Sequence, residues 1–124
     1  MKNKYISLAL AVLILSSIAK ADPPSEWVNF ERIKEAYSKA DAELNFVYRQ
    51  QLQEYKKEGA EFYGQSESRD IYLKKSQLAW IKMRDASCDY ENYESKTGAA
   101  FSSINEKCLL DKTNERIEYL KKYN

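Results

Sequence analysis

Histidine is absent from the 124-residue sequence, and only two cysteines and three glycines are present. The commonest general acid–base side chain is therefore missing, and zinc would lack its usual imidazole ligands. Segment 85–91 also lacks the alternating oxygen ligands and the central glycine of a calcium loop. No serine lies in a nucleophile elbow or beside a lysine in a recognisable catalytic motif. We therefore expect neither an enzyme nor a binding site for a metal or a cofactor.

A long hydrophobic run occurs only at the start of the chain, where 14 of residues 1–21 are apolar. Two lysines precede this run and small residues follow it, which is the plan of a secretory signal peptide. The alternative is a retained membrane anchor, for which the run is marginal because serines interrupt it and about 20 apolar residues are needed. We expect cleavage after Ala21, which leaves one domain at residues 22–124. That domain would be periplasmic or secreted, without a stable membrane anchor.

Charge of one sign is not in large excess either. The complete chain has 20 basic and 19 acidic residues, but three of the lysines lie in the expected signal peptide. Removing them leaves 17 basic against 19 acidic residues, a net charge of −2 for residues 22–124. We expect no nucleic-acid partner, because binding phosphates requires a strongly basic face. A weakly acidic domain remains compatible with a basic protein partner.

The two cysteines, Cys88 and Cys108, are separated by 20 positions. An exported protein meets an oxidising environment, where an isolated even pair normally forms a disulfide. The closed loop stabilises the fold by about 3 kcal/mol in the chain-entropy model. We expect this disulfide to support a domain that is too small to bury a large core.

Apolar residues recur every three or four positions in three stretches, which is the pattern of amphipathic helices. Ser25 and Ser68 are suited to cap the first two helices. We expect helices at about 25–58, 69–90 and 104–122, with connections at 59–68 and 92–103. The apolar candidates of the second helix are Ile71, Leu73, Leu78, Trp80, Ile81, Met83 and Cys88. The expected fold is all-α, a small antiparallel three-helix bundle with one disulfide.

The cysteines set the register of the last two helices. In an antiparallel pair of helices, the numbers of two residues at the same height always add up to the same value. The turning point is Gly98, which places Trp80 level with Arg116, whose guanidinium can stack on the indole ring. A turning point near Tyr63 in the first connection brings Arg84 level with Asp41 or Ala42, within reach of the Asp41 carboxylate. We expect these two residues to form a structural ion pair that helps to set the helix register. The expected polar layer comprises Asp41, Asn45, Gln77, Arg84 and Thr113, with Trp80 and Arg116 beside it.

Segment 85–95 combines four acidic residues and two tyrosines without a basic residue. Acidic side chains near a helix C-terminus oppose the helix dipole, so stability does not require them there. Tyrosine is favoured in binding surfaces because it offers a large rigid contact area with a polar tip. One interpretation is a solvated acidic rim with tyrosines filling gaps between helices, and the other is a docking edge for a basic protein. The expected contact residues of such an edge are Asp89, Tyr90, Glu91, Tyr93 and Glu94.

Three segments carry a pattern of residues with a defined order and spacing: ADAELNFVY (40–48), SQLAWIKMRDASC (76–88) and CLLDKTNERIEYL (108–120). Its matching positions are Asp41, Leu44, Asn45, Tyr48, Gln77, Trp80, Arg84, Asp85, Cys88, Cys108, Thr113, Arg116 and Leu120. On these positions the chain resembles the exported LprI-like lysozyme inhibitor family. The chain departs from the family in two respects. It lacks a further cysteine pair before the first segment, and its loop has one glycine, Gly98, where members often have a pair.

The resemblance implies an exported helical domain and, for some members of the family, inhibition of lysozyme. The matched positions have the character of scaffold, so we place the contacts at the acidic edge and in the loop 92–104. The first hypothesis is a protein that binds a lysozyme-like muramidase and blocks its cleft, because a basic enzyme attracts acidic side chains. The alternative is a non-enzymatic envelope interaction or scaffolding module with another protein partner. An enzyme that uses a carboxylate pair is a third hypothesis, but close pairs among 19 acids arise without any function.

Overall fold

The computed structural model describes residues 25–124. The expected signal peptide at 1–21 lies outside the described residues, as do positions 22–24 at the start of the expected domain. In the described part of the chain, no helix is both long and apolar enough to cross a membrane. Residues 25–124 form three long helices and two single-turn 3-10 helices, without a strand. The expected all-α class is therefore confirmed.

Helix α1 (Glu26–Glu58) is the longest element, and its 33 residues extend over about 50 Å. Ser25 caps its start as expected, because the Ser25 hydroxyl accepts a hydrogen bond of 3.3 Å from the Val28 amide. The helix ends at Gly59, whose φ of 75° lies in the left-handed region that favours glycine. The Gly59 amide donates to the Tyr55 carbonyl at 3.1 Å and closes the last turn.

The two following helices are connected through single 3-10 turns, η1 (Glu61–Tyr63) and η2 (Tyr93–Ser95). Helix α2 (Arg69–Glu91) begins after Ser68, whose hydroxyl bonds to the Asp70 carboxylate and not to a backbone amide of the first turn. The expected capping by the Ser68 side chain is therefore wrong, although the helix start is right.

Helix α3 (Phe101–Lys121) begins three residues before the expected start at position 104. Its N-cap residue is Ala100, which has no side-chain oxygen to accept a bond from the first turn. The Ala100 carbonyl accepts from the Ile104 amide at 3.1 Å, so the helical bonding already starts there. The sequence therefore lacks the usual signal for this boundary.

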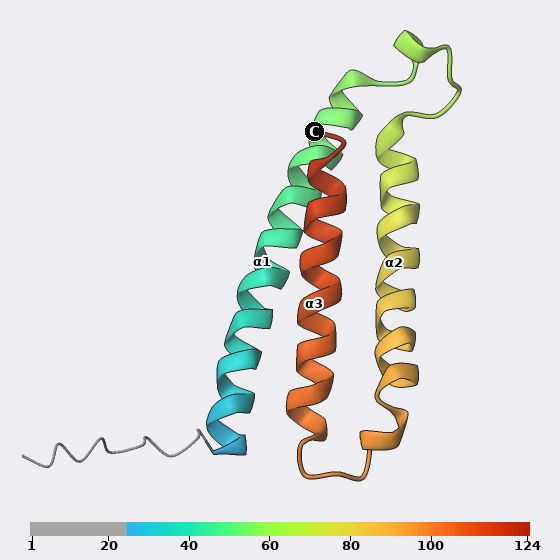
Figure 1. Ribbon diagram of the computed structural model, residues 1–124. Coiled ribbons are helices and arrows are strands. Elements are labelled where there is room, and N and C mark those ends of the chain that lie inside the picture. Colours follow the sequence, from blue (N-terminus) through green and yellow to red (C-terminus); the bar gives the residue numbers. More distant parts are fainter. Residues whose placement is uncertain (1–24) are drawn as a thin grey trace, which may run out of the picture.

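The three helices run up, down and up, so that consecutive helices are antiparallel (Figure 1). The first and third helices are consequently parallel to each other, and they pack against each other more closely than either packs against α2. The hydrophobic core consists of Ala40, Leu44, Val47 and Tyr55 from α1, Leu73 and Trp80 from α2, and Ile117 and Leu120 from α3. Tyr48, Leu52 and Leu110 pack against this core. The expected antiparallel bundle is confirmed.

The buried face of α2 differs from the apolar pattern of its sequence. Leu78 and Met83, two of the apolar candidates, have 56% and 59% of their surface exposed. Two polar residues, Gln77 and Arg84, are buried instead. The buried residues Leu73, Gln77, Trp80, Arg84 and Cys88 follow one another by three or four positions and lie on one face of the helix.

Candidate interaction surface

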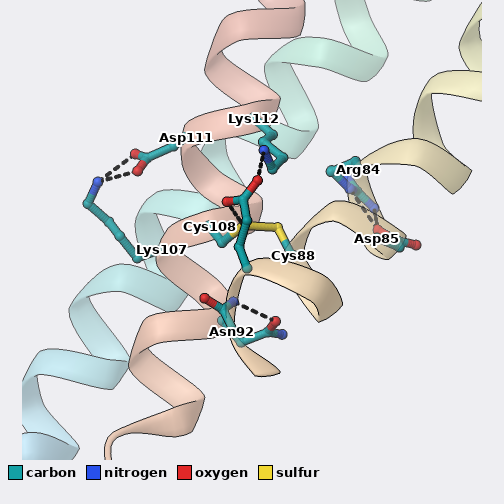
Figure 2. Close-up of a disulfide and its surroundings, with 10 residues drawn as sticks. Arg84, Asp85, Cys88, Asn92, Lys107, Cys108, Asp111 and Lys112 are labelled. Carbon is teal, nitrogen blue, oxygen red and sulfur yellow. Dashed lines mark hydrogen bonds and ion pairs between the residues drawn. A yellow bond between two sulfur atoms is a disulfide. The ribbon is translucent and has the colours of Figure 1, made fainter. Parts of the chain in front are cut away.

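The disulfide joins the last turns of α2 to the second turn of α3 (Figure 2). Cys88 and Cys108 have their Cα atoms 5.8 Å apart, and only 1% of the Cys88 surface is exposed. The bond closes the chain segment that contains the end of α2, η2 and the loop before α3. The expected disulfide is therefore present, and it encloses all five residues of the expected docking edge.

The five edge residues are all exposed to solvent. Asp89, Tyr90 and Glu91 occupy the last turn of α2, while Tyr93 and Glu94 lie in the single turn of η2. The two tyrosines have 83% and 72% of their surface exposed. They do not fill gaps between helices, so the interpretation of these rings as packing residues is wrong. We call the surface formed by Asp89, Tyr90, Glu91, Tyr93 and Glu94 the tyrosine edge.

Cations from outside the segment partly neutralise the acidic residues of this region. The Glu91 carboxylate pairs through Oε1 with Lys112 of α3 at 2.8 Å, and its other oxygen lies 3.6 Å from Cys108 Sγ of the disulfide (Figure 2). Asp89 lies 4.0 Å from Lys96. Within residues 25–124, Glu94 has no cationic group within 4.0 Å, so it is the acid of the tyrosine edge whose charge is least compensated. The local negative field is therefore smaller than the sequence suggests.

Backbone hydrogen bonds continue without a break through the loop that follows the tyrosine edge. The Asn92 amide donates to the Cys88 carbonyl at 3.0 Å, and the Ser95 amide donates to the Asn92 carbonyl at 3.0 Å. The Gly98 amide then donates to Ser95 at 2.9 Å, and the Phe101 amide to Gly98 at 3.2 Å. This succession of turns and the disulfide give the exposed tyrosines a base of fixed backbone.

Two arginines lie close to the indole ring of Trp80, a residue of the hydrophobic core. The guanidinium carbon of Arg84 is 5.1 Å from the centroid of the indole ring, and that of Arg116 is 5.6 Å away. Only 9% of the Trp80 surface is exposed. Cations at these distances are attracted to the ring face. The register that places Trp80 level with Arg116 is therefore confirmed.

The expected ion pair between Asp41 and Arg84 does not form. Arg84 instead binds its neighbour Asp85 through Nε and Nη2, each 2.8 Å from Oδ1 (Figure 2). Asp41 accepts a hydrogen bond of 3.2 Å from the Asn45 amide group on the next turn of α1. Arg84 and Asp41 thus each bond within their own helix, and no charge pair links α1 to α2 at this height among the described residues.

Arg116 is the most deeply placed cation that has no acidic partner. Its Nε donates to Oε1 of Gln77 at 3.0 Å, its Nη2 donates to the Ser76 hydroxyl at 2.9 Å, and 7% of its surface is exposed. Burial lowers the pKa of the guanidinium from its usual value, and the Tyr119 side chain opposes this effect. In residues 25–124 no carboxylate lies within 4.0 Å of Arg116. Among the described residues, Gln77 and Arg116 thus form the one bond between helices in the expected polar layer, and the buried hydroxyl of Thr113 has no hydrogen-bond partner.

Sequence reasoning missed a second group of polar residues at the far end of the bundle. Gln51 is 1% exposed, and its amide donates to the Leu120 carbonyl at 2.7 Å. The Tyr55 hydroxyl donates to the Tyr123 carbonyl at 2.8 Å. The available signal was an amide at a position of α1 where the three-and-four spacing requires a buried residue. These bonds attach the end of α3 to α1.

Comparison with known proteins places the chain in a family. A family model described as "Lysozyme inhibitor LprI" matches residues 26–120, which include all three long helices almost completely. An uncharacterized protein of Rhizobium meliloti (strain 1021) is 36% identical over 92 residues, a match that spans 68% of this chain and 63% of the relative. No solved structure matches the chain. The chain belongs to the LprI lysozyme inhibitor family.

Proposed function

We propose that this protein is exported, binds a lysozyme-type muramidase and blocks its substrate cleft through the tyrosine edge. The observation that supports this proposal most directly is the match to the lysozyme inhibitor family over residues 26–120. The protein acts by binding and supplies no catalytic group of its own. Its expected location is the periplasm or the exterior of the cell.

The tyrosine edge has the properties of a contact surface for a protein. Tyr90 and Tyr93 are large and largely exposed, and they stand on a backbone that the disulfide and the turn hydrogen bonds hold. A surface that is ordered before binding loses less entropy when the complex forms. Exposed aromatic rings become hot spots when a partner desolvates them, each contributing about 2 kcal/mol or more.

Electrostatic attraction has a smaller part than the sequence alone suggests. Lys112 and Lys96 compensate Glu91 and Asp89, and exposed pairs of this kind contribute about 1 kcal/mol or less. A basic enzyme can still displace or share these lysines, and Glu94 is available without competition from a neighbouring cation. We therefore assign most of the binding energy to the tyrosine rings and a moderate effect on the association rate to the acids.

A muramidase assay with and without the purified protein tests this proposal. We expect inhibition by the native protein and a loss of at least tenfold in inhibitory potency for the double variant Tyr90→Ala/Tyr93→Ala, because two ring contacts are removed. The matched control is Phe46→Ala, which removes an aromatic ring that is 59% exposed on α1, away from the edge. This control should inhibit like the native protein.

Two results contradict the proposal in different ways. If the native protein does not inhibit at a large molar excess in low salt, it is not an inhibitor of the muramidase tested. If it inhibits but the double tyrosine variant is equally potent, the contact surface lies elsewhere. Replacing Asp89, Glu91 and Glu94 by serine should weaken inhibition and reduce its salt dependence, and an unchanged response excludes the acids as contacts.

The second candidate function is a non-enzymatic interaction or scaffolding module of the cell envelope with a different partner. The exposed apolar side chains Leu78 and Met83 on α2 favour this candidate, because the tyrosine edge does not account for them. A pulldown from envelope extract distinguishes the two functions. Recovery of another protein, together with an inactive result in the muramidase assay, supports the module and excludes the inhibitor.

A further inference from the structure

A groove lies between the second half of α1, the start of α2 and the end of α3. Its volume is about 340 Å³, which falls in the usual range of small-molecule sites. Four tyrosines, Tyr55, Tyr72, Tyr119 and Tyr123, line it together with Arg69. In Figure 1 these parts of the helices lie at the end of the bundle that carries η1, away from the η2 end. The groove is therefore separate from the tyrosine edge.

The walls of the groove are held by hydrogen bonds within the protein. Tyr55 donates to the Tyr123 carbonyl, and Gln51, which also lines the groove, donates to the Leu120 carbonyl. Both bonds attach α1 to the end of α3. The groove is thus formed before any ligand binds, which lowers the entropy cost of binding.

Arg69 offers an exposed guanidinium at this groove without an acidic partner. Its guanidinium carbon lies 4.8 Å from the ring centroid of Tyr55 and 5.4 Å from that of Tyr63. Among residues 25–124, no carboxylate lies within 4.0 Å of the Arg69 side chain. The Tyr55 side chain also engages Arg69 through a hydrogen bond, which raises the pKa of the guanidinium. A guanidinium has five N–H donors and matches a carboxylate through two parallel hydrogen bonds, so Arg69 can also bind a carboxylate in the groove.

A second cation lies behind the wall of the same groove. Arg116 hydrogen-bonds the Ser76 hydroxyl, and its guanidinium carbon is 5.0 Å from the ring centroid of Tyr119. Both of these residues line the groove. A buried arginine is normally paired with an acid, but Arg116 has only neutral partners among the described residues. This end of a weakly acidic domain therefore carries two guanidinium groups, and neither has a carboxylate within 4.0 Å among residues 25–124.

We propose that this groove binds a small ligand that carries one carboxylate beside a flat or apolar body. The carboxylate binds Arg69, with Arg116 contributing its field from behind the wall, and the body packs on the tyrosine rings. A single negative charge fits because, among residues 25–124, Arg69 is the one cation that lines the groove. A carboxylate of this kind occurs at the end of a peptide and in a sugar acid. The proposal does not depend on lysozyme inhibition, because the groove and the tyrosine edge share no residue.

Two matched pairs of probes test the proposal and separate the two sources of the carboxylate. The first pair is N-acetylphenylalanine and its carboxamide, and the second is glucuronic acid and glucose. Binding to the native protein is measured by titration calorimetry and by NMR shifts of amides that line the groove. We expect at least one acid to bind about tenfold or more tightly than its uncharged counterpart, because a hydrogen bond to a charged group is lost in the counterpart. The pair that responds identifies the source.

Variants then show whether the binding uses the groove. Arg69→Gln should weaken binding of the acid by about tenfold. Tyr72→Ala should weaken binding of the acid and of its counterpart, because it removes a ring that both would contact. Lys74→Gln is the matched control: it removes an exposed cation on the same helix that does not line the groove, and binding should not change. Circular dichroism confirms that each variant is folded.

Three results overturn the proposal. The first is the absence of binding by both acids at millimolar concentration. The second is equal binding of an acid and its uncharged counterpart. The third is unchanged binding of the acid by folded Arg69→Gln and Tyr72→Ala proteins.

Discussion

Removing the disulfide should destabilise the whole bundle, because this bond attaches α2 to the rest of the fold. The perturbation is the double variant Cys88→Ala/Cys108→Ala. Alanine retains helix propensity at both positions, each of which lies inside a helix. Helix α2 packs less closely against the other helices than they pack against each other, so it depends most on the cross-link.

The magnitude follows from the size of the closed loop. A sequence separation of 20 residues corresponds to about 3 kcal/mol at 25 °C in the chain-entropy model. Truncating the buried Cys88 side chain adds about 1 kcal/mol or less from lost burial. The free energy of unfolding of a small domain is about 5–15 kcal/mol in total. The variant should therefore remain folded at 25 °C but lose a large part of this free energy.

Urea unfolding followed by circular dichroism measures this loss, with the dithiothreitol-reduced native protein as the control for the cross-link alone. We expect the reduced protein to lose about 3 kcal/mol and the variant to lose that amount or slightly more. The midpoint of thermal unfolding should fall by roughly 10–25 °C. A loss below about 1 kcal/mol for both proteins would refute the argument that the disulfide acts by restricting the unfolded chain.

Three other changes test separate features of the packing. Thr113→Val should raise the free energy of unfolding by about 1 kcal/mol in urea titration, because it removes a fully buried hydroxyl without a hydrogen-bond partner. Gln51→Leu should lower it by about 1 kcal/mol, because the Leu120 carbonyl loses the Gln51 amide but retains the Tyr123 amide at 3.1 Å. Burial raises the pKa of Tyr37, so the folded state binds its proton more tightly than the unfolded state. Stability should therefore fall as the pH rises above about 10, and thermal unfolding should show a smaller fall for Tyr37→Phe.

Each of these expectations has a result that contradicts it. A Thr113→Val protein that is less stable than the native protein would mean that the hydroxyl makes a favourable interaction. A loss well above 3 kcal/mol for Gln51→Leu would mean that the end of α3 detaches when this one bond is removed. Identical alkaline transitions of the native protein and Tyr37→Phe would mean that Tyr37 has the same pKa in the folded and unfolded states.

The helices themselves could be predicted from the sequence because helix formation depends on local patterns. The spacing of apolar residues, the cap at Ser25 and the glycine at position 59 lie within the segments that they define. The antiparallel register of α2 and α3 followed from a covalent constraint, the single pair Cys88 and Cys108. The start of α3 was missed because Ala100 provides no capping side chain.

The sequence by itself thus determined the fold class, the disulfide, the stacking of Arg116 on Trp80 and the family. Only the tertiary structure decided which charged side chains pair. Arg84 binds Asp85 on its own helix and not Asp41, and Lys112 of α3 pairs with Glu91 of α2. The physical reason is that long charged side chains select partners within a few ångströms, and such distances depend on the separation and rotation of whole helices. The rotation of α2 leaves Leu78 exposed, and the arrangement of the three helices forms the groove lined by Tyr55, Tyr72, Tyr119 and Tyr123. No local pattern in the sequence encodes either feature.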